Sequence, residues 1–398
     1  MRRRLVCALP VLALMLISAV ARGAPDNSFA AFLAALRVDA TARGITRSTF
    51  DAAFAGVTPD PAVLAAMRHE PEYGKPMPAY LASLVSSSRI ATGLRKSAQW
   101  SDTLRAVEKR YGVDPSILVA IWGIESSFGE ARDPWDVVRS LATLAYAKFQ
   151  PPYFRNELLT TLTILQQKHI PRSQFVGSWA GAMGQTQFMP SSYMTYAVDL
   201  DGDGRPDIWT SVPDVLASIA NYLQKAGWRP GLPWGFEVTI PHGFDYSESR
   251  GTFAEWSERG FRRADGKAFP AADAANAILF SPSGADGPAF LVSENFIVIK
   301  RYNNSDAYAL AVGTLANRLH GEGPFRAAWP ANDFQPSRGE RMALQRRLAQ
   351  LGYKVDDLNG HIDFALRDNI RSVQRQYGMA ADGYPSRPFL ERLGARTP

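Results

Sequence analysis

One apolar stretch, from Asp114 to Gly129, restricts the possible folds more than any other feature of the sequence. Asp114 followed by Pro115 is typical of a helix start, and Gly129 is typical of a helix stop. On this helix Glu125 would lie four residues after Ile121, on the apolar face that should be buried. Burial and the negative end of the helix dipole both disfavour an ionised carboxylate, so the sequence predicts a raised pKa for Glu125. A carboxyl group that keeps its proton suits general acid catalysis, although a terminal Glu that reaches solvent would explain the same pattern.

The length and the charge distribution predict an exported protein with two or three domains. The chain has 398 residues, of which 46% are hydrophobic and 21% are charged, a composition that excludes a disordered or fibrous protein. Its formal net charge is +6, but residues 1–23 contain four arginines and no acid. The rest of the chain is therefore nearly neutral, and nothing in its charge indicates a nucleic-acid partner.

Residues 1–23 have the organisation of a secretory signal peptide. Three arginines are followed by an apolar run from residue 5 to residue 20 and by small residues up to Gly23. The apolar run is shorter than the roughly 20 residues that span a bilayer, so we expect cleavage after Gly23 and no stable membrane insertion. The single cysteine, Cys7, would leave with this segment, so no disulfide is expected. The sequence therefore predicts a soluble periplasmic protein of the Gram-negative type.

The periodicity of apolar residues predicts a helix-rich α+β protein. Helical patterns dominate residues 28–111, and Asp214 is expected to cap a further helix. Glycine and proline become frequent from 230 to 287, and residues 289–302 have the composition of a strand. The boundaries that we expect are a signal peptide at 1–23, a large domain at 24–325, a linker at 326–337 and a small domain at 338–398.

The small domain is expected to contain three helices around a minimal core. Its 11 lysines and arginines exceed its 7 acids over residues 336–398, so it is basic. Two similar turns, one at Asn359-Gly360 and one at Asp382-Gly383, each precede a helix and suggest a duplicated half. A domain of this size is better suited to binding than to catalysis.

Residues 178–190 form a second stretch of chemical interest. Small residues and two amides lie among aromatic and methionine side chains, so the backbone could approach a ligand closely, with Gln187 offering hydrogen bonds. A glycine-rich loop that merely allows tight packing would look the same. The motifs of zinc proteases, phosphate-binding loops and nucleophile elbows do not occur.

A third stretch, residues 199–207 and here called the acidic loop, matches the start of an EF-hand calcium site. Carboxylates occupy positions 1, 3, 5 and 9, and glycine occupies position 6. Position 12 is Thr210 in place of the usual Glu, and Asp214 is the nearest substitute; a solvated acidic turn is the alternative. The predicted ligands are Asp199, Asp201, Asp203, Asp207 and Asp214, with the carbonyl of Arg205.

Taken together, these stretches resemble the soluble form of the lytic murein transglycosylase B family (glycoside hydrolase family 103). The resemblance covers about residues 26–325 and rests on Glu125 within 123–129, on 180–190, on the acidic loop and on 301–305. Residues 338–398 resemble the three-helix peptidoglycan-binding domain. The resemblance implies a lysozyme-like catalytic domain with a small β-containing subdomain. It also implies cleavage of the β-1,4 bond between N-acetylmuramic acid and N-acetylglucosamine of peptidoglycan, leaving 1,6-anhydromuramoyl ends.

The resemblance further implies that Glu125 is the single catalytic residue, which protonates the leaving oxygen and then deprotonates the C6 hydroxyl. It implies no catalytic cofactor, a structural calcium ion, and peptidoglycan glycan strands as the partner. The residues that it places along the sugar cleft are Ser178, Gln187, Phe188, Asn221, Tyr222, Tyr302, Asn303, Tyr153 and Tyr80.

Two alternatives to this function remain open from sequence. A hydrolytic muramidase would use water and a second carboxylate, for which Glu130, Asp133 and Asp136 are nearby in sequence. A non-catalytic peptidoglycan-binding protein would need no acid at 125. The chain also departs from some members of the family at 149–152, where Phe-Gln-Pro-Pro replaces a segment with arginines.

Overall fold

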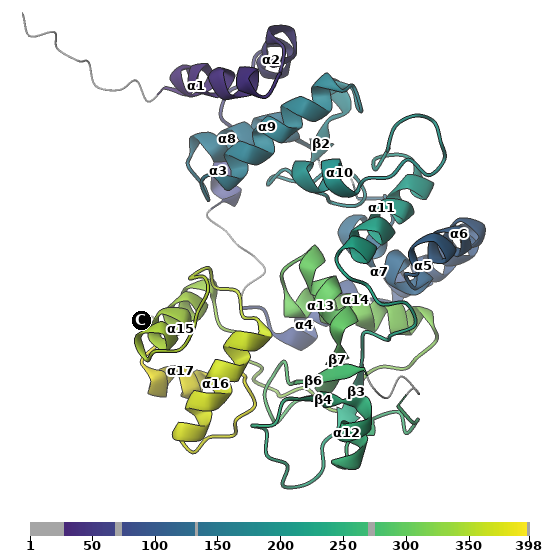
Figure 1. The fold of residues 1–398 in the computed structure, drawn as a ribbon, viewed down its shortest axis with the longest axis vertical. Coiled ribbons are helices and arrows are strands. Elements are labelled where there is room, and N and C mark those ends of the chain that lie inside the picture. Colours follow the sequence, from purple (N-terminus) through teal and green to yellow (C-terminus); the bar gives the residue numbers. More distant parts are fainter. Residues whose placement is uncertain (1–27, 68–73, 132–133, 270–274, 396–398) are drawn as a thin grey trace, which may run out of the picture.

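The computed structural model describes residues 28–67, 74–131, 134–269 and 275–395 (Figure 1). The predicted signal peptide, residues 1–23, lies outside these ranges. Within them, no helix is both long and apolar enough to cross a membrane. The chain folds into a helix-rich α+β structure, as expected, around four clusters of buried apolar side chains.

The upper lobe of Figure 1 is made of helices from two separate parts of the chain. They share one cluster of buried side chains, here called the upper core, which also receives Met183 and Phe188 from the loop before α10. Its helices are α1 (Phe29–Ala42), α2 (Arg47–Phe54), α3 (Pro61–Ala66), α8 (Val137–Tyr146), α9 (Tyr153–Gln166) and α10 (Pro190–Tyr196). A short antiparallel pair, β1 (Trp135–Asp136) and β2 (Val176–Gly177), and the 3-10 turn η1 (Arg172–Gln174) border it.

A second cluster, the central core, surrounds α7 (Pro115–Ser126). Residues 116–123 of α7 are all buried, so this helix is apolar on every side and not only along one face. The pattern is that of a helix at the centre of a protein. The other helices that contribute to the central core are α4 (Met77–Leu84), α5 (Ser87–Gln99), α6 (Ser101–Tyr111), α11 (Val212–Lys225), α13 (Glu294–Tyr302) and α14 (Asp306–Leu319).

An antiparallel sheet with strand order β4-β6-β7-β3-β5 forms the small β-containing part below the central core. One face of it packs with α12 (Phe253–Glu258) in a separate apolar cluster. The strands are β3 (Gly235–Thr239), β4 (Arg250–Thr252), β5 (Arg262–Arg263), β6 (Asn276–Phe280) and β7 (Ala289–Ser293).

The prediction of a strand across 289–302 is wrong in its second half. The strand β7 stops at Ser293, whose hydroxyl accepts the backbone N–H of Asn295 and so caps α13. Glu294 in the first turn and Arg301 in the last turn complement the helix dipole. Because the apolar run crosses this boundary without interruption, its composition alone does not show where the strand gives way to the helix.

The C-terminal domain has the three expected helices, α15 (Arg338–Gln350), α16 (Phe364–Gln376) and α17 (Arg387–Leu393), around its own core. Its two halves repeat one arrangement of hydrogen bonds. The side chain of Gln345 accepts the N–H of Gly360 (2.7 Å) and donates to Asn359 and the carbonyl of His361. The side chain of Gln374 makes the corresponding hydrogen bonds in the second half. It accepts the N–H of Gly383 (2.9 Å) and donates to Asp382 and the carbonyl of Tyr384. This repetition confirms the duplicated half that the two turns suggest.

The segment expected to be a linker is fixed to the sheet and to the central core. The carboxylate of Glu237 in β3 accepts the backbone N–H groups of Arg326 and Ala327 at 2.8–3.0 Å. Phe325 and Trp329 pack against the central core. The prediction of a simple spacer therefore misses how this segment is held.

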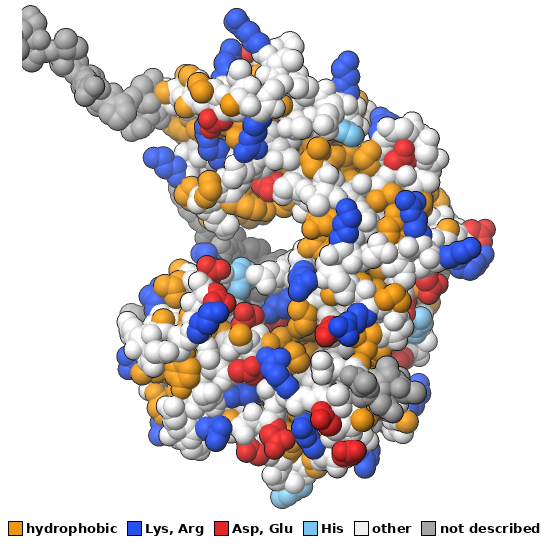
Figure 2. Space-filling model, in the orientation of Figure 1, with side chains coloured by type: hydrophobic (Ala, Val, Ile, Leu, Met, Phe, Trp, Pro, Cys, Tyr) orange, Lys and Arg blue, Asp and Glu red, His pale blue; other side chains and the backbone are white. Residues whose placement is uncertain are grey.

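The C-terminal domain also shares apolar packing with the rest of the molecule. Phe364, the first residue of α16, is 7% exposed and belongs to the central core. Its ring centroid lies 5.8 Å from that of Phe280 and 6.3 Å from that of Phe296. Beside it, Arg371 donates to the carbonyl of Leu279 at 3.0 Å. The space-filling view shows the molecule hollowed between the upper lobe and this docked domain (Figure 2).

A buried group of three charges completes this docking. Asp306, at the start of α14, lies 2.7 Å from Lys300 of α13 and 2.8 Å from Arg367 of α16. All three side chains are at most 11% exposed. Lys300 also donates to the carbonyl of Ile362 at 2.8 Å. This Asp306 cluster therefore joins two helices of the main domain to the C-terminal domain.

We expect Phe364→Ala to lower the free energy of unfolding by about 3–5 kcal/mol, because it removes a buried ring that both parts of the protein share. Leu358→Ala is the matched control: this side chain is 48% exposed, and its loss should change the free energy by less than about 0.5 kcal/mol. Urea unfolding followed by fluorescence, and thermal unfolding followed by calorimetry, measure the change in the free energy of unfolding for each variant. Equal losses for the two variants would contradict a shared core.

Candidate active site

Glu125 lies in the last turn of α7, and the backbone that follows it turns sharply. Asp114 caps the start of the helix, as predicted, by accepting the N–H of Ser116. The helix ends at Ser126, earlier than the predicted stop at Gly129. Residues 127–129 then have φ values of 50°, 62° and 80°, three consecutive left-handed conformations of which only the last is glycine. This reversal leaves the Glu125 side chain half-buried at the end of the helix.

The hydroxyl of Tyr308, in the first turn of α14, donates to Oε1 of Glu125 at 2.6 Å. Tyr308 is 1% exposed. Burial raises the pKa of its hydroxyl well above the usual value, and the charge of Glu125 raises this pKa further. Tyr308 therefore keeps its proton and acts as a fixed donor to the carboxyl group. The sequence analysis assigns no role to Tyr308; the signal for one is that a buried tyrosine hydroxyl needs a hydrogen-bond partner.

An aromatic group surrounds this pair. The ring of Tyr302 lies parallel to that of Tyr308, with centroids 6.4 Å apart, and its hydroxyl donates to the carbonyl of Thr186 at 2.8 Å. Tyr222 packs on Tyr302 at 4.8 Å and donates to the carbonyl of Arg301 at 2.6 Å. Burial raises the pKa of Tyr222 to about 12. The structure thus brings together residues of four helices, α7, α11, α13 and α14, that are far apart in the sequence.

Phe188 is buried, whereas the family resemblance implies that it lines the sugar cleft. Its ring is 2% exposed and packs between Tyr222 (5.8 Å) and Tyr302 (5.7 Å). The ring therefore supports the aromatic group from within the upper core. Asn221 is half-buried and donates to the carbonyl of Tyr196 at 2.9 Å, which ties α11 to α10.

The loop from Ser178 to Phe188 is folded on itself beside the end of α7. The hydroxyl of Ser178 accepts the N–H of Ala182 at 3.0 Å. Gln185 accepts the indole N–H of Trp122 at 2.7 Å and so fixes this loop to α7. A Cβ at Gly129 would lie 2.4 Å from the amide oxygen of Gln185, so a side chain at this position would displace that amide.

Gln187, in a left-handed conformation (φ 52°), donates to the carbonyl of Gly184 at 3.0 Å and lines an open cavity of about 460 Å³. Trp209 and His169 line the same cavity. A volume of this order accommodates a sugar unit. Asn303 and Tyr80 line a different cavity, next to the C-terminal domain. Tyr153 stands apart at the start of α9, 43% exposed, with its ring against Phe154.

The structure describes two of the three acids that could act as a second carboxylate, Asp136 and Glu130. Asp136 caps α8 and forms an ion pair with Arg172 at 2.6 Å, so its carboxylate is already held. Glu130 is exposed. Asp133 lies outside the described residues.

The acidic loop brings only part of its predicted ligand set together. Carboxylate oxygens of Asp199, Asp201 and Asp214 lie within 4.8 Å of one another. Asp214 is fully buried inside the loop and accepts the backbone N–H groups of Leu200 (2.7 Å) and Asp207 (2.8 Å). Burial raises the pKa of Asp214 in spite of these hydrogen bonds, which lower it. Ser211, and not Asp214, caps α11, so the predicted cap is wrong.

Asp203 and Asp207 turn toward other partners. Asp203 lies 3.5 Å from Arg205, and Asp207 accepts the N–H groups of Trp209 and Thr210 at 2.9 Å. The three clustered carboxylates offer hard oxygen donors of the kind that calcium prefers, so this part of the set fits the ion.

Comparison with known proteins gives family matches for both parts of the chain. Residues 28–317 match the family described as the transglycosylase SLT domain, and residues 337–393 match the family of a peptidoglycan binding domain. The membrane-bound lytic murein transglycosylase B of Escherichia coli (strain K12) is 32% identical over 247 residues. That match spans 60% of this chain and 66% of the relative, which is just under two thirds of its length.

Solved structures are similar in fold as well. SltB3 from Pseudomonas aeruginosa in complex with NAG-anhNAM-pentapeptide is 47% identical, with a TM-score of 0.84, over 92% of this chain and 99% of that one. The Escherichia coli lytic transglycosylase Slt35 in complex with calcium is 26% identical, with a TM-score of 0.61, over 74% of this chain and 93% of that one.

Proposed function

The chain belongs to the transglycosylase SLT family, and we propose that it is a lytic transglycosylase that cleaves the β-1,4 bond between N-acetylmuramic acid and N-acetylglucosamine in peptidoglycan. The fold is lysozyme-like. The observation that carries the proposal is the hydrogen bond from Tyr308 to Glu125, because it fixes one carboxyl group at the junction of the loop 178–188 and the aromatic group. The products are a free N-acetylglucosamine 4-hydroxyl and a 1,6-anhydromuramoyl end.

In the proposed mechanism Glu125 gives a proton and then takes one back. Tyr308 donates to Oε1, so the acidic proton resides on Oε2, from which it passes to the glycosidic oxygen as the C1–O bond breaks. The C6 hydroxyl of the same muramoyl unit then attacks C1, and the Glu125 carboxylate accepts the hydroxyl proton. The proton balance closes without water or a cofactor, since Glu125 ends as it began.

The sugar contacts and the location belong to the same proposal. We assign the binding of sugar units to Ser178, Gln187, Asn221, Tyr222, Tyr302, Asn303, Tyr80 and Tyr153, with Phe188 behind them. Residues 1–23 would export the chain to the periplasm, where the C-terminal domain would hold it on peptidoglycan. The main domain would span 24–325 and the connecting segment 326–337.

We expect Glu125→Gln to reduce cleavage by at least about 10²- to 10⁴-fold, because an amide of nearly the same shape cannot donate or accept the proton. Digestion of isolated peptidoglycan followed by mass spectrometry measures both rate and product. The wild-type product should be one water lighter than a reducing end. Reducing ends from the wild type would assign a hydrolytic muramidase instead, and near-normal turnover by Glu125→Gln would remove Glu125 from the mechanism.

We expect Tyr308→Phe to lower kcat by about 10- to 100-fold, the equivalent of one hydrogen bond to a charged group, with little change in KM. Tyr353→Phe is the control, since it removes a hydroxyl that Gln376 contacts in the C-terminal domain. Steady-state kinetics on soluble muropeptides separates the two parameters. A rise in KM at constant kcat would mean that Tyr308 contributes to binding alone.

We also propose that the acidic loop binds calcium for stability, through Asp199, Asp201 and Asp214, with Asp203, Asp207 and the carbonyl of Arg205 as further ligands. The three clustered carboxylates support this proposal. Along the chain, the acidic loop lies between the loop 178–188 and α11. A bound ion that orders the acidic loop would therefore fix two sides of the site.

Calcium at about 100 times its Kd should stabilise the fold by about 2.7 kcal/mol, so the melting temperature in calcium should exceed that in chelator. Asp214→Asn should abolish this difference. Glu258→Gln, which removes one charge from an exposed position, should retain it. Identical melting temperatures of the wild type in calcium and in chelator would mean that the acidic loop binds no stabilising calcium ion.

A further inference from the structure

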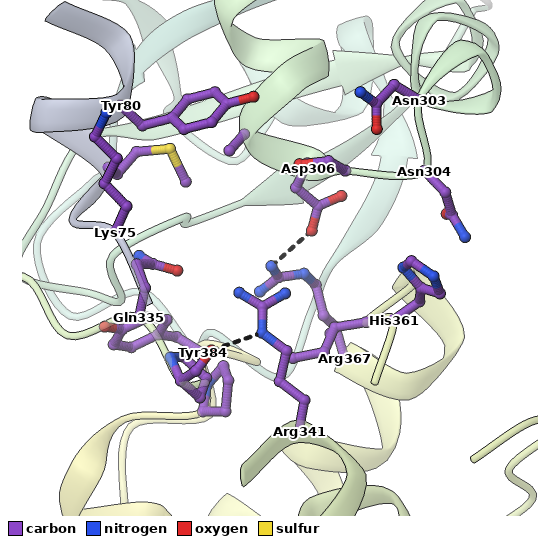
Figure 3. Close-up of a pocket in the computed structure, with 16 residues that line it drawn as sticks. Lys75, Tyr80, Asn303, Asn304, Asp306, Gln335, Arg341, His361, Arg367 and Tyr384 are labelled. Carbon is purple, nitrogen blue, oxygen red and sulfur yellow. Dashed lines mark hydrogen bonds and ion pairs between the residues drawn. The ribbon is translucent and has the colours of Figure 1, made fainter. Parts of the chain in front are cut away.

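The C-terminal domain contacts the main domain at the first turn of α14, which also bears Tyr308. Arg367, near the start of α16, donates through Nη2 to the carboxylate of Asp306 at 2.8 Å (Figure 3). Asp306 is the first residue of α14, and Tyr308 follows it by two positions. One helical turn therefore carries both the contact with the C-terminal domain and the donor to Glu125.

The position of this turn decides the hydrogen bond to Glu125. Ser305 caps α14 by accepting the backbone N–H of Tyr308 at 3.3 Å, which ties the Tyr308 backbone to the same turn as Asp306. The Tyr308 hydroxyl lies 2.6 Å from Oε1 of Glu125. Because the strength of a hydrogen bond depends steeply on its geometry, a small shift or rotation of the turn would weaken this contact.

The second cation of the Asp306 cluster supports the neighbouring tyrosine. Lys300 lies 2.7 Å from Asp306 and donates to the carbonyl of Ile362 in the C-terminal domain at 2.8 Å. Tyr302 follows Lys300 by two positions on α13, and its ring lies parallel to that of Tyr308, with an interplanar angle of 11°. The cluster thus fixes the helix ends that bear both tyrosines.

The C-terminal domain in turn sets the position of Arg367. Nη1 of Arg367 donates to the carbonyl of Gly383 at 3.1 Å, and Gln374 accepts the N–H of the same glycine at 2.9 Å. The guanidinium also lies 5.0 Å from the ring centroid of Phe280 in β6. Arg367 is 6% exposed, so water screens its charge little. The folded C-terminal domain therefore presents a fixed cation to Asp306.

We propose that Arg367 is a positioning residue for cleavage, an inference that rests on the proposed function. By holding Asp306, it places the Tyr308 hydroxyl against Glu125. The C-terminal domain thus supports the chemical step in addition to attaching the enzyme to the wall.

The first test is the effect of Arg367→Met on cleavage of soluble muropeptides, which do not require attachment to the insoluble wall. Methionine keeps much of the length of the side chain and removes its charge. We expect kcat to fall by about 10-fold with little change in KM, since the proton donor would be misplaced and the sugar contacts would remain. Arg367→Lys keeps a charge opposite Asp306 and should recover part of kcat.

Arg371→Met is the matched control. Arg371 lies one turn further along α16, is 4% exposed and also reaches the main domain, where it donates to the carbonyl of Leu279 in β6 at 3.0 Å. Its loss should weaken the docking of the C-terminal domain but leave kcat close to that of the wild type, because β6 bears none of the proposed catalytic residues. Thermal melting records how much stability each variant loses.

A double-mutant cycle separates positioning from a general loosening of the fold. In a Tyr308→Phe background, Arg367→Met should change kcat by less than about 2-fold, because the hydrogen bond that it disturbs is already absent. A merely structural role would lower kcat by the same factor in both backgrounds.

Hydrogen exchange followed by mass spectrometry tests the proposal without turnover. Residues 305–312 should exchange faster in Arg367→Met than in the wild type or in Arg371→Met. Failure of the proposed function would be seen separately, as absence of cleavage by the wild type, and the exchange comparison would still decide whether Arg367 holds this turn. If Arg367→Met does not fold, Arg367→Lys and Arg371→Lys replace the two methionine variants in every comparison.

Three kinetic results would overturn the proposal: a normal kcat for Arg367→Met, equal losses of kcat for Arg367→Met and Arg371→Met, or an undiminished loss in the Tyr308→Phe background. Unchanged exchange of residues 305–312 in Arg367→Met would overturn it as well.

Discussion

The buried ion cluster of Lys300, Asp306 and Arg367 is the contact on which the rest of the arrangement depends. Burial of the Asp306 carboxylate would raise its pKa, but the two cations outweigh this effect and lower the pKa to about 2. Asp306 is therefore ionised at every pH above about 4, and its stabilising contribution is lost only as the pH falls from there toward 2. Removal of one partner from a buried ion pair costs about 3–5 kcal/mol, so the loss of any one of the three charges would destabilise the docked arrangement. That arrangement fixes the end of α13, with Tyr302 and Asn303, and the start of α14, with Tyr308.

Much of the local structure could be predicted from the sequence because short-range rules decide it. The cap at Asp114, the three C-terminal helices and the duplicated turns all follow from residues only a few positions apart. The hydrogen bonds of Gln345 and Gln374 show why the turns repeat, since each amide satisfies the backbone of one turn. The interactions that hold residues 326–337 could not be predicted in this way, because Glu237 lies 89 and 90 residues from its partners there.

The site could be predicted only in part, for the same reason. Glu125 stands out in the sequence as an acid in an apolar helix, but Tyr308, its hydrogen-bond partner, is 183 residues away and looks like any buried aromatic residue. Phe188 shows the converse: it belongs to a recognisable motif, yet its ring is buried in the upper core. In the acidic loop the spacing of carboxylates predicts five ligand side chains, whereas the folded loop gathers three and commits the other two to hydrogen bonds and an ion pair.

The docked connecting segment has a consequence for how such an enzyme would move over its substrate. A flexible tether gives two modules an effective concentration that depends on tether length, and it lets one module search while the other stays bound. Here Glu237 and the shared packing of Phe364 remove that freedom. On the proposed function, the point of attachment and the point of cleavage are separated by a fixed distance along the strand, so the spacing between anchor and cut is a property of the fold.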